Sequence, residues 1–262
     1  MRTLPRAGAG LLALTLALGI TACGSDDDDS TDTTVAAKGD GAASGDTGAF
    51  CDALVEFNGA VMEVEIDDTT PEADVKEAGG QLAELTQALV DNAPEDLADG
   101  AEEIHGFVTP MAEEGDASVF NQDSSFEAYG KFLGDATEAC DFQTVDVTAK
   151  DYAFEAPNTV KAGNVSFALT NSSDAEEHEM IVMAKADGVD LTWEELLALP
   201  EEEAQSKVHF AGFAFAPPGE SSSTLATLAP GDYAMVCFIP VGGAEDGPPH
   251  FTQGMVHEFT VE

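Results

Sequence analysis

The apolar residues of this chain change their spacing between Cys140 and Val145. Before that point they recur every three to four residues, and after it they alternate with polar residues. The first spacing places apolar side chains on one face of a helix, and the second places them on one face of a strand. We therefore expect an α + β chain in which a helical part and a β part are separate domains.

Residues 49–141 are predicted to form the helical part. The second helix is expected to begin near Pro71 and to end before Pro94. Four stripes of apolar residues at helical spacing support this prediction: Phe50, Leu54, Phe57 and Val61; Val75, Leu82, Leu85 and Leu89; Leu97, Ile104, Phe107 and Val108; Phe126, Tyr129, Phe132 and Leu133. Four helices with short connections favour an up-down bundle, in which the first helix begins at the end of the bundle where the fourth helix ends.

Residues 144–262 are predicted to form an all-β sandwich, because short alternating stretches are separated by turn residues. The clearest stretches are Val165, Phe167 and Leu169; Tyr233, Met235 and Cys237; and His257, Phe259 and Val261. Turn residues occupy 161–163, 171–173 and 229–232. One helical insertion is expected at Thr192, which precedes Glu195 with the spacing of a capping box.

The first 22 residues have the layout of a secretory signal. Arg2 and Arg6 precede an apolar run, Leu11–Ile20, that is too short to span a bilayer. The run ends at Cys23 in a sequence that resembles the lipobox of bacterial lipoproteins. This resemblance implies cleavage before Cys23, a lipid on its thiol, and a location on the outer face of the cell membrane. The open alternative is ordinary signal cleavage near Ala22.

Residues 23–48 are rich in Asp, Ser, Thr and Gly, which predicts a disordered acidic tether. No later stretch contains the eighteen or so consecutive apolar residues of a spanning helix. We therefore expect contact with the membrane through the lipid anchor only.

The remaining cysteines can be assigned by compartment. Cys51 and Cys140 bracket the helical part, and an exported chain meets oxidising conditions, so we expect a disulfide between them. In the chain-entropy model, closing so long a loop stabilises the fold by about 4–5 kcal/mol. Cys237 is left without a disulfide partner.

The formal net charge of −42, from 51 acidic and 9 basic residues, argues against nucleic acid as a partner. The acids are spread along the chain, which favours general solvation over an acidic docking face for a basic partner. Neither a phosphate-binding loop, a dinucleotide fingerprint nor a hydrolase nucleophile motif occurs. The chain is therefore predicted not to be an enzyme.

The C-terminal part carries a family resemblance. The pattern from Gly231 through Tyr233 to Cys237, followed by His250 and Met255, resembles the end of a cupredoxin, the blue-copper fold of plastocyanin and its relatives. Upstream, a predicted strand ends at Asn171 and His178 follows, where that family has its first copper ligand. The resemblance covers residues 144–262. It implies a Greek-key sandwich that holds one mononuclear copper through His178, Cys237, His250 and Met255.

The donor types are chemically coherent. Two imidazoles and a thiolate make a trigonal set, and a thioether adds a weak axial contact, which suits a copper ion that changes oxidation state. The loop 238–249 is longer than in most relatives. It either folds back as an ordered flap or indicates that the site has diverged from the copper-binding pattern of the family. His209 is a rival first ligand, and His257 is either a core residue or a support behind the site.

The resemblance implies one-electron transfer with a redox partner that the sequence does not identify. It also implies that His250, beside Pro248, Pro249 and Phe251, is where the electron enters or leaves. Two alternatives stay open: a copper storage or delivery protein, and a metal-free binding module of cupredoxin fold.

Overall fold

The computed structural model describes residues 45–64, 66, 69–118, 122–244 and 247–262. The predicted signal 1–22, the lipidation site Cys23 and the tether up to residue 44 lie outside the described residues. Four long helices come first: α1 (Thr47–Glu63), α2 (Glu72–Asn92), α3 (Ala98–Glu114) and α4 (Asp123–Ala139). Within the described residues, no helix is long and apolar enough to cross a membrane.

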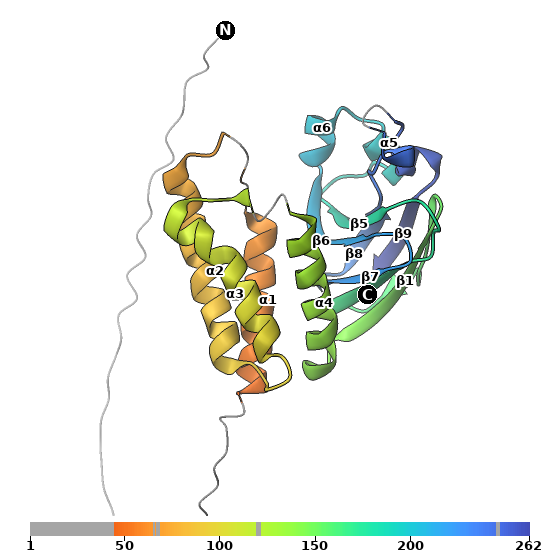
Figure 1. Ribbon diagram of the computed structural model, residues 1–262. Coiled ribbons are helices and arrows are strands. Elements are labelled where there is room, and N and C mark those ends of the chain that lie inside the picture. The colour runs from red at the N-terminus through yellow and green to blue at the C-terminus, as the bar shows by residue number, and fades with distance from the viewer. Residues whose placement is uncertain (1–44, 65, 67–68, 119–121, 245–246) are drawn as a thin grey trace, which may run out of the picture. The chain divides into compact units, whose positions relative to one another are not determined.

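Helices α1, α2 and α3 pack together through the predicted apolar stripes (Figure 1). Asp46 caps α1, because its side chain accepts the backbone N–H groups of Gly48 and Ala49 that the first turn leaves without helical partners. Phe50 and Leu54 are fully buried one turn apart. The helical part of the prediction is therefore confirmed.

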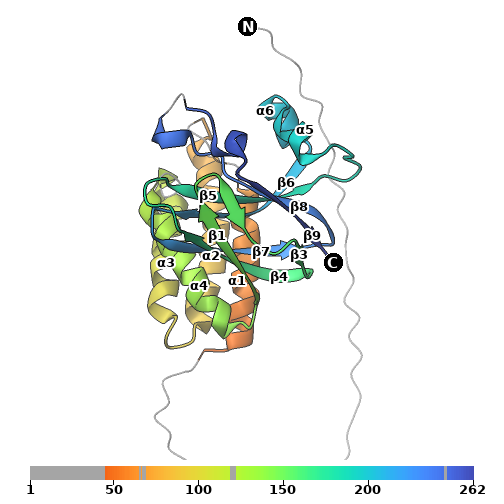
Figure 2. The ribbon, with the colours of Figure 1, turned by 90° about the vertical axis from the view of Figure 1, so that its right-hand side faces the viewer.

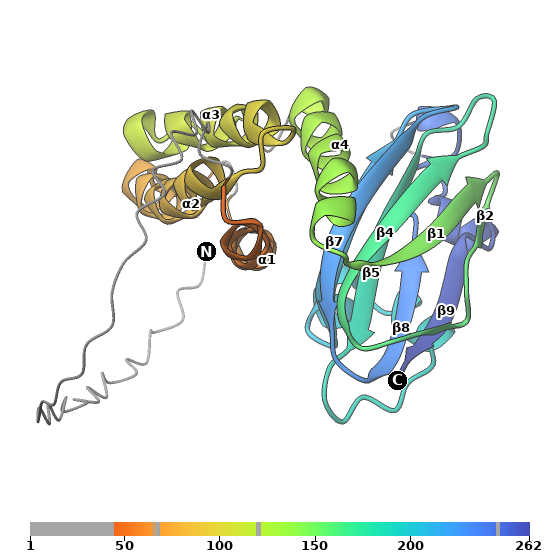
Figure 3. The ribbon, with the colours of Figure 1, turned by 90° about the horizontal axis from the view of Figure 1, so that it is seen from below.

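Helix α4 belongs to the helical apolar cluster through Phe132, Leu133 and Ala136, and it also lies along strand β7 (Ser221–Leu228) of the sandwich (Figure 3). Gly130 and Gly134 face that strand, and a Cβ atom on Gly130 would lie 2.2 Å from Ser222 Oγ. Two small residues one turn apart let the helix backbone approach the sheet. The apolar stripe of α4 predicts only its packing on other helices, so the pattern could not show this second contact with the sheet.

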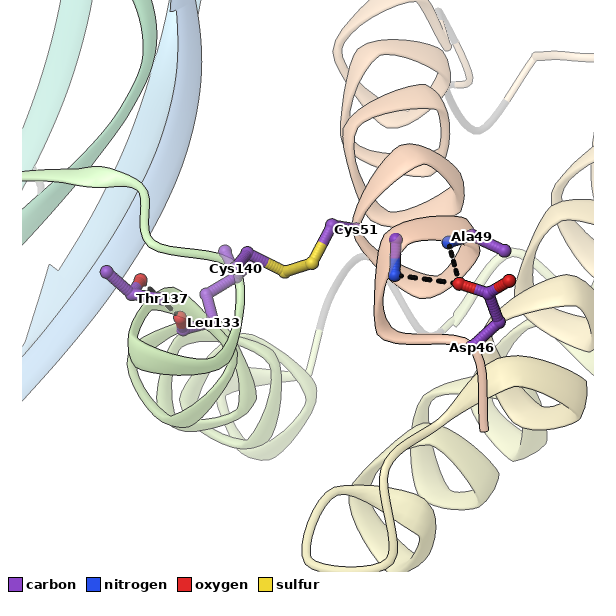
Figure 4. Close-up of a disulfide and its surroundings, with 7 residues drawn as sticks. Asp46, Ala49, Cys51, Leu133, Thr137 and Cys140 are labelled. Atoms are coloured by element: carbon purple, nitrogen blue, oxygen red, sulfur yellow. Dashed lines mark hydrogen bonds between the residues drawn. A yellow bond between two sulfur atoms is a disulfide. The ribbon is translucent and has the colours of Figure 1, made fainter. Parts of the chain in front are cut away.

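The predicted disulfide is confirmed. Cys51 of α1 is bonded to Cys140, the residue that follows the last turn of α4 (Figure 4). Phe50 and Phe132 pack edge to face between the same two helices, with ring centroids 6.1 Å apart. The bridge therefore ties the first of the four helices to the last.

In the part of the chain that the structure describes, nine strands follow these helices and form two sheets that face each other (Figure 3). One sheet has the order β2-β1-β4-β7 and the other the order β3-β9-β8-β5-β6. The remaining strands are β1 (Gln143–Lys150), β2 (Ala153–Glu155), β3 (Thr159–Val160), β4 (Gly163–Asn171), β5 (His178–Lys185), β6 (Val208–Ala216), β8 (Gly231–Val236) and β9 (Val256–Val261). The predicted all-β sandwich is confirmed.

The inward-facing residues of both sheets form one apolar core that includes Val165, Phe167, Leu169, Met180 and Met235. The core residues of β4 are two positions apart because residues two apart in a strand point to the same face of the sheet. Cys237 and Met255 belong to the same core. The predicted site is thus built at one end of the sandwich interior.

The predicted insertion between β5 and β6 is helical. It contains α5 (Trp193–Leu197) and α6 (Glu201–Gln205), which lie next to each other at one end of the sandwich (Figures 1 and 2). The capping box is present, because Thr192 Oγ1 accepts the Glu195 N–H and the Glu195 side chain accepts the Thr192 N–H. Trp193 and Leu196 are buried by this arrangement.

The helices and the sandwich belong to one compact unit. Asn58 of α1 is buried, and its Nδ2 donates to the carbonyl oxygen of Leu225 in β7 at 2.8 Å. Its Oδ1 accepts from Tyr129 of α4 at 3.1 Å. Since Leu225 also belongs to the helical apolar cluster, the two parts share both a polar contact and a core.

Candidate metal centre

Three of the four predicted ligand residues meet at the end of the sandwich. His178, Cys237 and His250 place their ligand atoms within 4.8 Å of one another, and all three side chains are fully buried. The Nδ1 atoms of the two histidines are 3.3 Å apart, and Cys237 Sγ lies 3.4 Å from His250 Nδ1. They form the one such group found in the part of the chain that the structure describes.

His178 is the first residue of β5, and the turn before it is fixed by Asn171, the last residue of β4. Asn171 is buried, and its Nδ2 donates to the carbonyl oxygens of Glu176 and Ala216, both at 2.9 Å. Ser173 N–H donates to the Oδ1 of Asn171. The predicted strand-ending Asn therefore positions the turn that leads into His178.

Cys237 directly follows β8. Its backbone N–H donates to the carbonyl oxygen of Met255 at 3.3 Å, and its own carbonyl accepts the Phe251 N–H at 2.9 Å. On the next residue, the Phe238 N–H donates to the Glu179 side chain at 2.9 Å. These bonds hold the thiol between the segment that carries the other predicted ligands and the neighbouring strand β5.

His250 begins a short 3-10 helix (His250–Gln253) that ends at Gly254, whose φ of 108° is in the region that favours glycine. The Met255 N–H donates to the carbonyl of His250 at 3.2 Å, so the spacing from His250 to Met255 corresponds to one closed turn. Met255 is fully buried next to Cys237.

The described residues of the loop 238–249 are ordered as a flap. Pro240 and Pro249 form an isolated β-bridge, and Val241 N–H donates to the carbonyl of Pro248 at 3.1 Å. The His250 N–H donates to the carbonyl of Ile239 at 2.9 Å. The described residues of this long loop therefore fold back on one another, as expected for a flap.

Burial sets the protonation of the donors. It raises the pKa of the Cys237 thiol to about 12, so the metal-free residue is a neutral thiol at pH 7. It also lowers the pKa of His178 to about 4, with the nearby His250 adding to this effect, so His178 is neutral at pH 7. Burial likewise raises the pKa of Glu179 beside it.

The distances fit a bound metal. A metal bonded to two imidazole nitrogens at about 2.0–2.1 Å with tetrahedral angles holds those nitrogens roughly 3.3 Å apart, and the two Nδ1 atoms here are 3.3 Å apart. The Nε2 atoms of both histidines are buried without a hydrogen-bond partner. Two imidazoles, one thiolate and one thioether are the donor set of a mononuclear type 1 copper site.

The other histidines of the described residues lie outside this group. His209 is exposed on β6, so it is not the rival ligand considered above. His257 is half-buried on β9, and its Nε2 lies 3.2 Å from the carbonyl oxygen of Pro157. His105 contacts Thr86 between α3 and α2, with 2.8 Å between Nδ1 and Oγ1.

The sequence prediction missed the residues that enclose His250. Glu176 Oε2 lies 3.5 Å from His250 Nε2, and the Tyr152 ring packs edge to face on the imidazole at 5.2 Å between centroids. His250, which the resemblance implied to be the electron port, is consequently fully buried. The only available signal for Glu176 was its place two residues before a predicted ligand.

An apolar pocket of about 500 Å³ adjoins the group. It is lined by Phe238, Pro249 and Phe251, each next to a predicted ligand in sequence, and by Trp193 and Leu196 of the insertion. The Phe238 and Phe251 rings are tilted against each other, with 5.2 Å between their centroids. Of the apolar neighbours of His250, Pro249 and Phe251 therefore line this pocket.

No protein-family model matches the sequence, and no curated protein matches it. Among solved structures, the chain is similar to a dithionite-reduced auracyanin from Roseiflexus castenholzii, at 20% identity over 46% of this chain and 97% of the other, with a TM-score of 0.31. Auracyanin A, a "blue" copper protein of Chloroflexus aurantiacus, is 18% identical over 45% of this chain and 98% of its own, with a TM-score of 0.30.

Rusticyanin from Thiobacillus ferrooxidans is 15% identical over 45% of this chain and 76% of its own, with a TM-score of 0.30. These similarities concern the C-terminal half. The buried donor residues of this chain are themselves the reason to expect a metal in it.

Proposed function

We propose that this chain is an exported copper protein that carries single electrons, with one mononuclear copper held by His178, Cys237, His250 and Met255. The observation that supports this most strongly is the buried group of two imidazole Nδ1 atoms and one thiol sulfur. Copper in such a donor set supplies a one-electron couple between Cu(II) and Cu(I).

The protein's contribution is to fix the donors before the metal arrives. Asn171 fixes the turn before His178, and Cys237 and Met255 are joined by a backbone hydrogen bond. The four side chains have no exposed surface, so water is kept from the donors. Donors that are already in place limit the rearrangement that accompanies a change of oxidation state.

We further propose that the protein is anchored by a lipid on Cys23 at the outer face of the cell membrane. The Cys51–Cys140 disulfide supports export, because such bonds persist in oxidising compartments. Mass spectrometry of the membrane fraction tests the anchor. A diacylglyceryl group on a chain that begins at residue 23 is expected, and a chain without lipid that begins after Ala22 would contradict it.

Voltammetry of the copper-loaded soluble fragment 45–262 tests the electron-carrier role. We expect one reversible one-electron wave per protein, with the same protein recovered after repeated cycles. Loss of copper on reduction would instead favour the storage or delivery function. Fully buried donors favour retention of the ion over its exchange.

A further inference from the structure

The outer edge of His250 is enclosed by three segments that are far apart in the sequence. The β1–β2 turn contributes Tyr152, the turn before β5 contributes Glu176, and the loop 238–249 contributes Gly242. Glu176 contacts both His250 and the loop 238–249. Its Oε2 lies 3.5 Å from His250 Nε2 and accepts the Gly242 N–H at 3.0 Å.

Glu176 is itself held in place. Its backbone carbonyl accepts from Asn171 Nδ2, and its backbone N–H donates to Ser173 Oγ, both at 2.9 Å. Its side chain is 19% exposed, so the carboxylate is largely shielded from water. Gly242 presents its N–H from a backbone with a φ of 70°, a conformation that side chains disfavour.

Tyr152 adds a second constraint. It is a non-glycine residue with a φ of 63°, in the two-residue connection between Lys150 and Ala153. Such a conformation costs free energy and persists where the surrounding structure imposes it. Here it accompanies the contact between the phenol ring and the His250 imidazole.

Metal coordination through Nδ1 leaves a proton on Nε2. A histidine that binds metal usually donates this second N–H to a carboxylate, a carbonyl or water, which fixes the ring and strengthens the ligand. In the described residues, His250 Nε2 has no hydrogen-bond partner, and Glu176 Oε2 is the carboxylate oxygen that faces it. A small movement of either side chain shortens 3.5 Å to a hydrogen bond.

We propose that Glu176 is a positioning residue that fastens the loop 238–249 over His250, orients the imidazole and stabilises the oxidised copper site. This inference rests on the proposed function. A carboxylate next to a ligand stabilises Cu(II) more than Cu(I), because the oxidised ion carries one more positive charge. The same residue thereby couples the long loop to the reduction potential.

Two substitutions separate the charge from the fastening. Glu176→Gln keeps an oxygen acceptor for the Gly242 N–H and removes the charge, whereas Glu176→Ala removes both. Glu177 is the matched control, because it is the neighbouring residue, is exposed and carries the same formal charge. Glu177→Gln therefore reports the effect of losing one negative charge at the surface.

In copper-loaded protein, Glu176→Gln is expected to raise the reduction potential more than Glu177→Gln does. We also expect its Cu(II) affinity to fall by about 10–100-fold, the usual effect of losing such a partner. A potential and an affinity equal to those of Glu177→Gln would overturn the electrostatic role of Glu176.

Metal-free protein provides an independent readout. Hydrogen exchange of the Gly242 amide, followed by NMR, is expected to be at least about tenfold faster in Glu176→Ala than in Glu177→Ala, because a hydrogen bond to a charged group is lost. Equal exchange rates would overturn the fastening role. A wild-type chain that binds no copper would remove the proposed function, and the exchange measurement would still decide the fastening.

Discussion

Burial of Cys237 has a direct consequence for metal uptake. A thiol with a pKa of about 12 is protonated at pH 7, and only the thiolate binds the metal. Copper binding must therefore release the Cys237 proton. His178 adds no proton to this exchange, because burial keeps its pKa near 4.

We predict that Cu(II) binding at pH 7 releases about one proton more from the wild type than from Cys237→Ser. Proton release in a weakly buffered solution, measured with an indicator dye, checks this. Equal release from the two proteins would mean that the thiol is not deprotonated on binding.

His178 makes the metal-free fold sensitive to acid. Its pKa is about 4 in the folded state and about 6.5 when unfolded, so the unfolded chain binds more protons between these values. Stability from neutral His178 is complete above pH 6.5 and is lost as the pH falls towards 4. We predict that the unfolding free energy of the metal-free protein decreases over this window by on the order of 2 kcal/mol through His178.

Chemical denaturation at several pH values measures this change. His178→Gln is expected to flatten the pH dependence, and His209→Gln, which alters an exposed histidine, is expected to leave it unchanged. A His178→Gln protein with the wild-type slope would contradict the assignment.

At the scale of single elements, sequence spacing selected three residues, His178, Cys237 and His250, that the structure brings together. The five-residue spacing from His250 to Met255 spans the 3-10 helix and Gly254, and the Met255 N–H bond to the His250 carbonyl closes it. Asn171 marks the turn before His178. Both contacts join residues that are close together in the chain, so their spacing can be recognised in the sequence. Glu176 and Tyr152 approach His250 from turns that are distant in the sequence, so their contacts depend on how the sheets pack and could not be predicted.

The contact between α4 and the sheet was missed for a related reason. Its apolar stripe fits a bundle helix, but Gly130 and Gly134 on its other side allow a close approach to β7. Glycine in a helix reduces its intrinsic stability, and the use of these two glycines as a contact surface is recognised only when the partner strand is known.

The disulfide joins α1 to the end of α4 and closes a loop with a sequence separation of 89 residues. We predict that Cys51→Ser/Cys140→Ser lowers the free energy of unfolding by about 2–5 kcal/mol. Urea denaturation under identical conditions measures the difference. An unchanged midpoint would show that the bridge constrains little in the unfolded chain.

At the scale of the whole molecule, the helices and the sandwich are joined by Asn58, by the apolar cluster around Leu225 and by the α4–β7 contact. A change of hydrophobic period separates the two parts in sequence, yet it does not predict whether they unfold separately. Shared buried contacts favour a single cooperative transition.

We predict that the two parts unfold together in urea. Far-UV circular dichroism reports mainly on α1–α4, and fluorescence reports on Trp193, the single tryptophan, which is buried beside the sandwich. Coincident transitions are expected for the metal-free protein. Two separated midpoints would show that the helical part and the sandwich are independent.

We propose that the Cys237 thiolate, with His178 and His250, binds one copper ion. Titration of the metal-free fragment 45–262 with Cu(II), followed by visible absorption, is the decisive test. We predict an intense thiolate-to-copper band that saturates at one equivalent and is absent from Cys237→Ser. No band in the wild type, or the same band in Cys237→Ser, would contradict it.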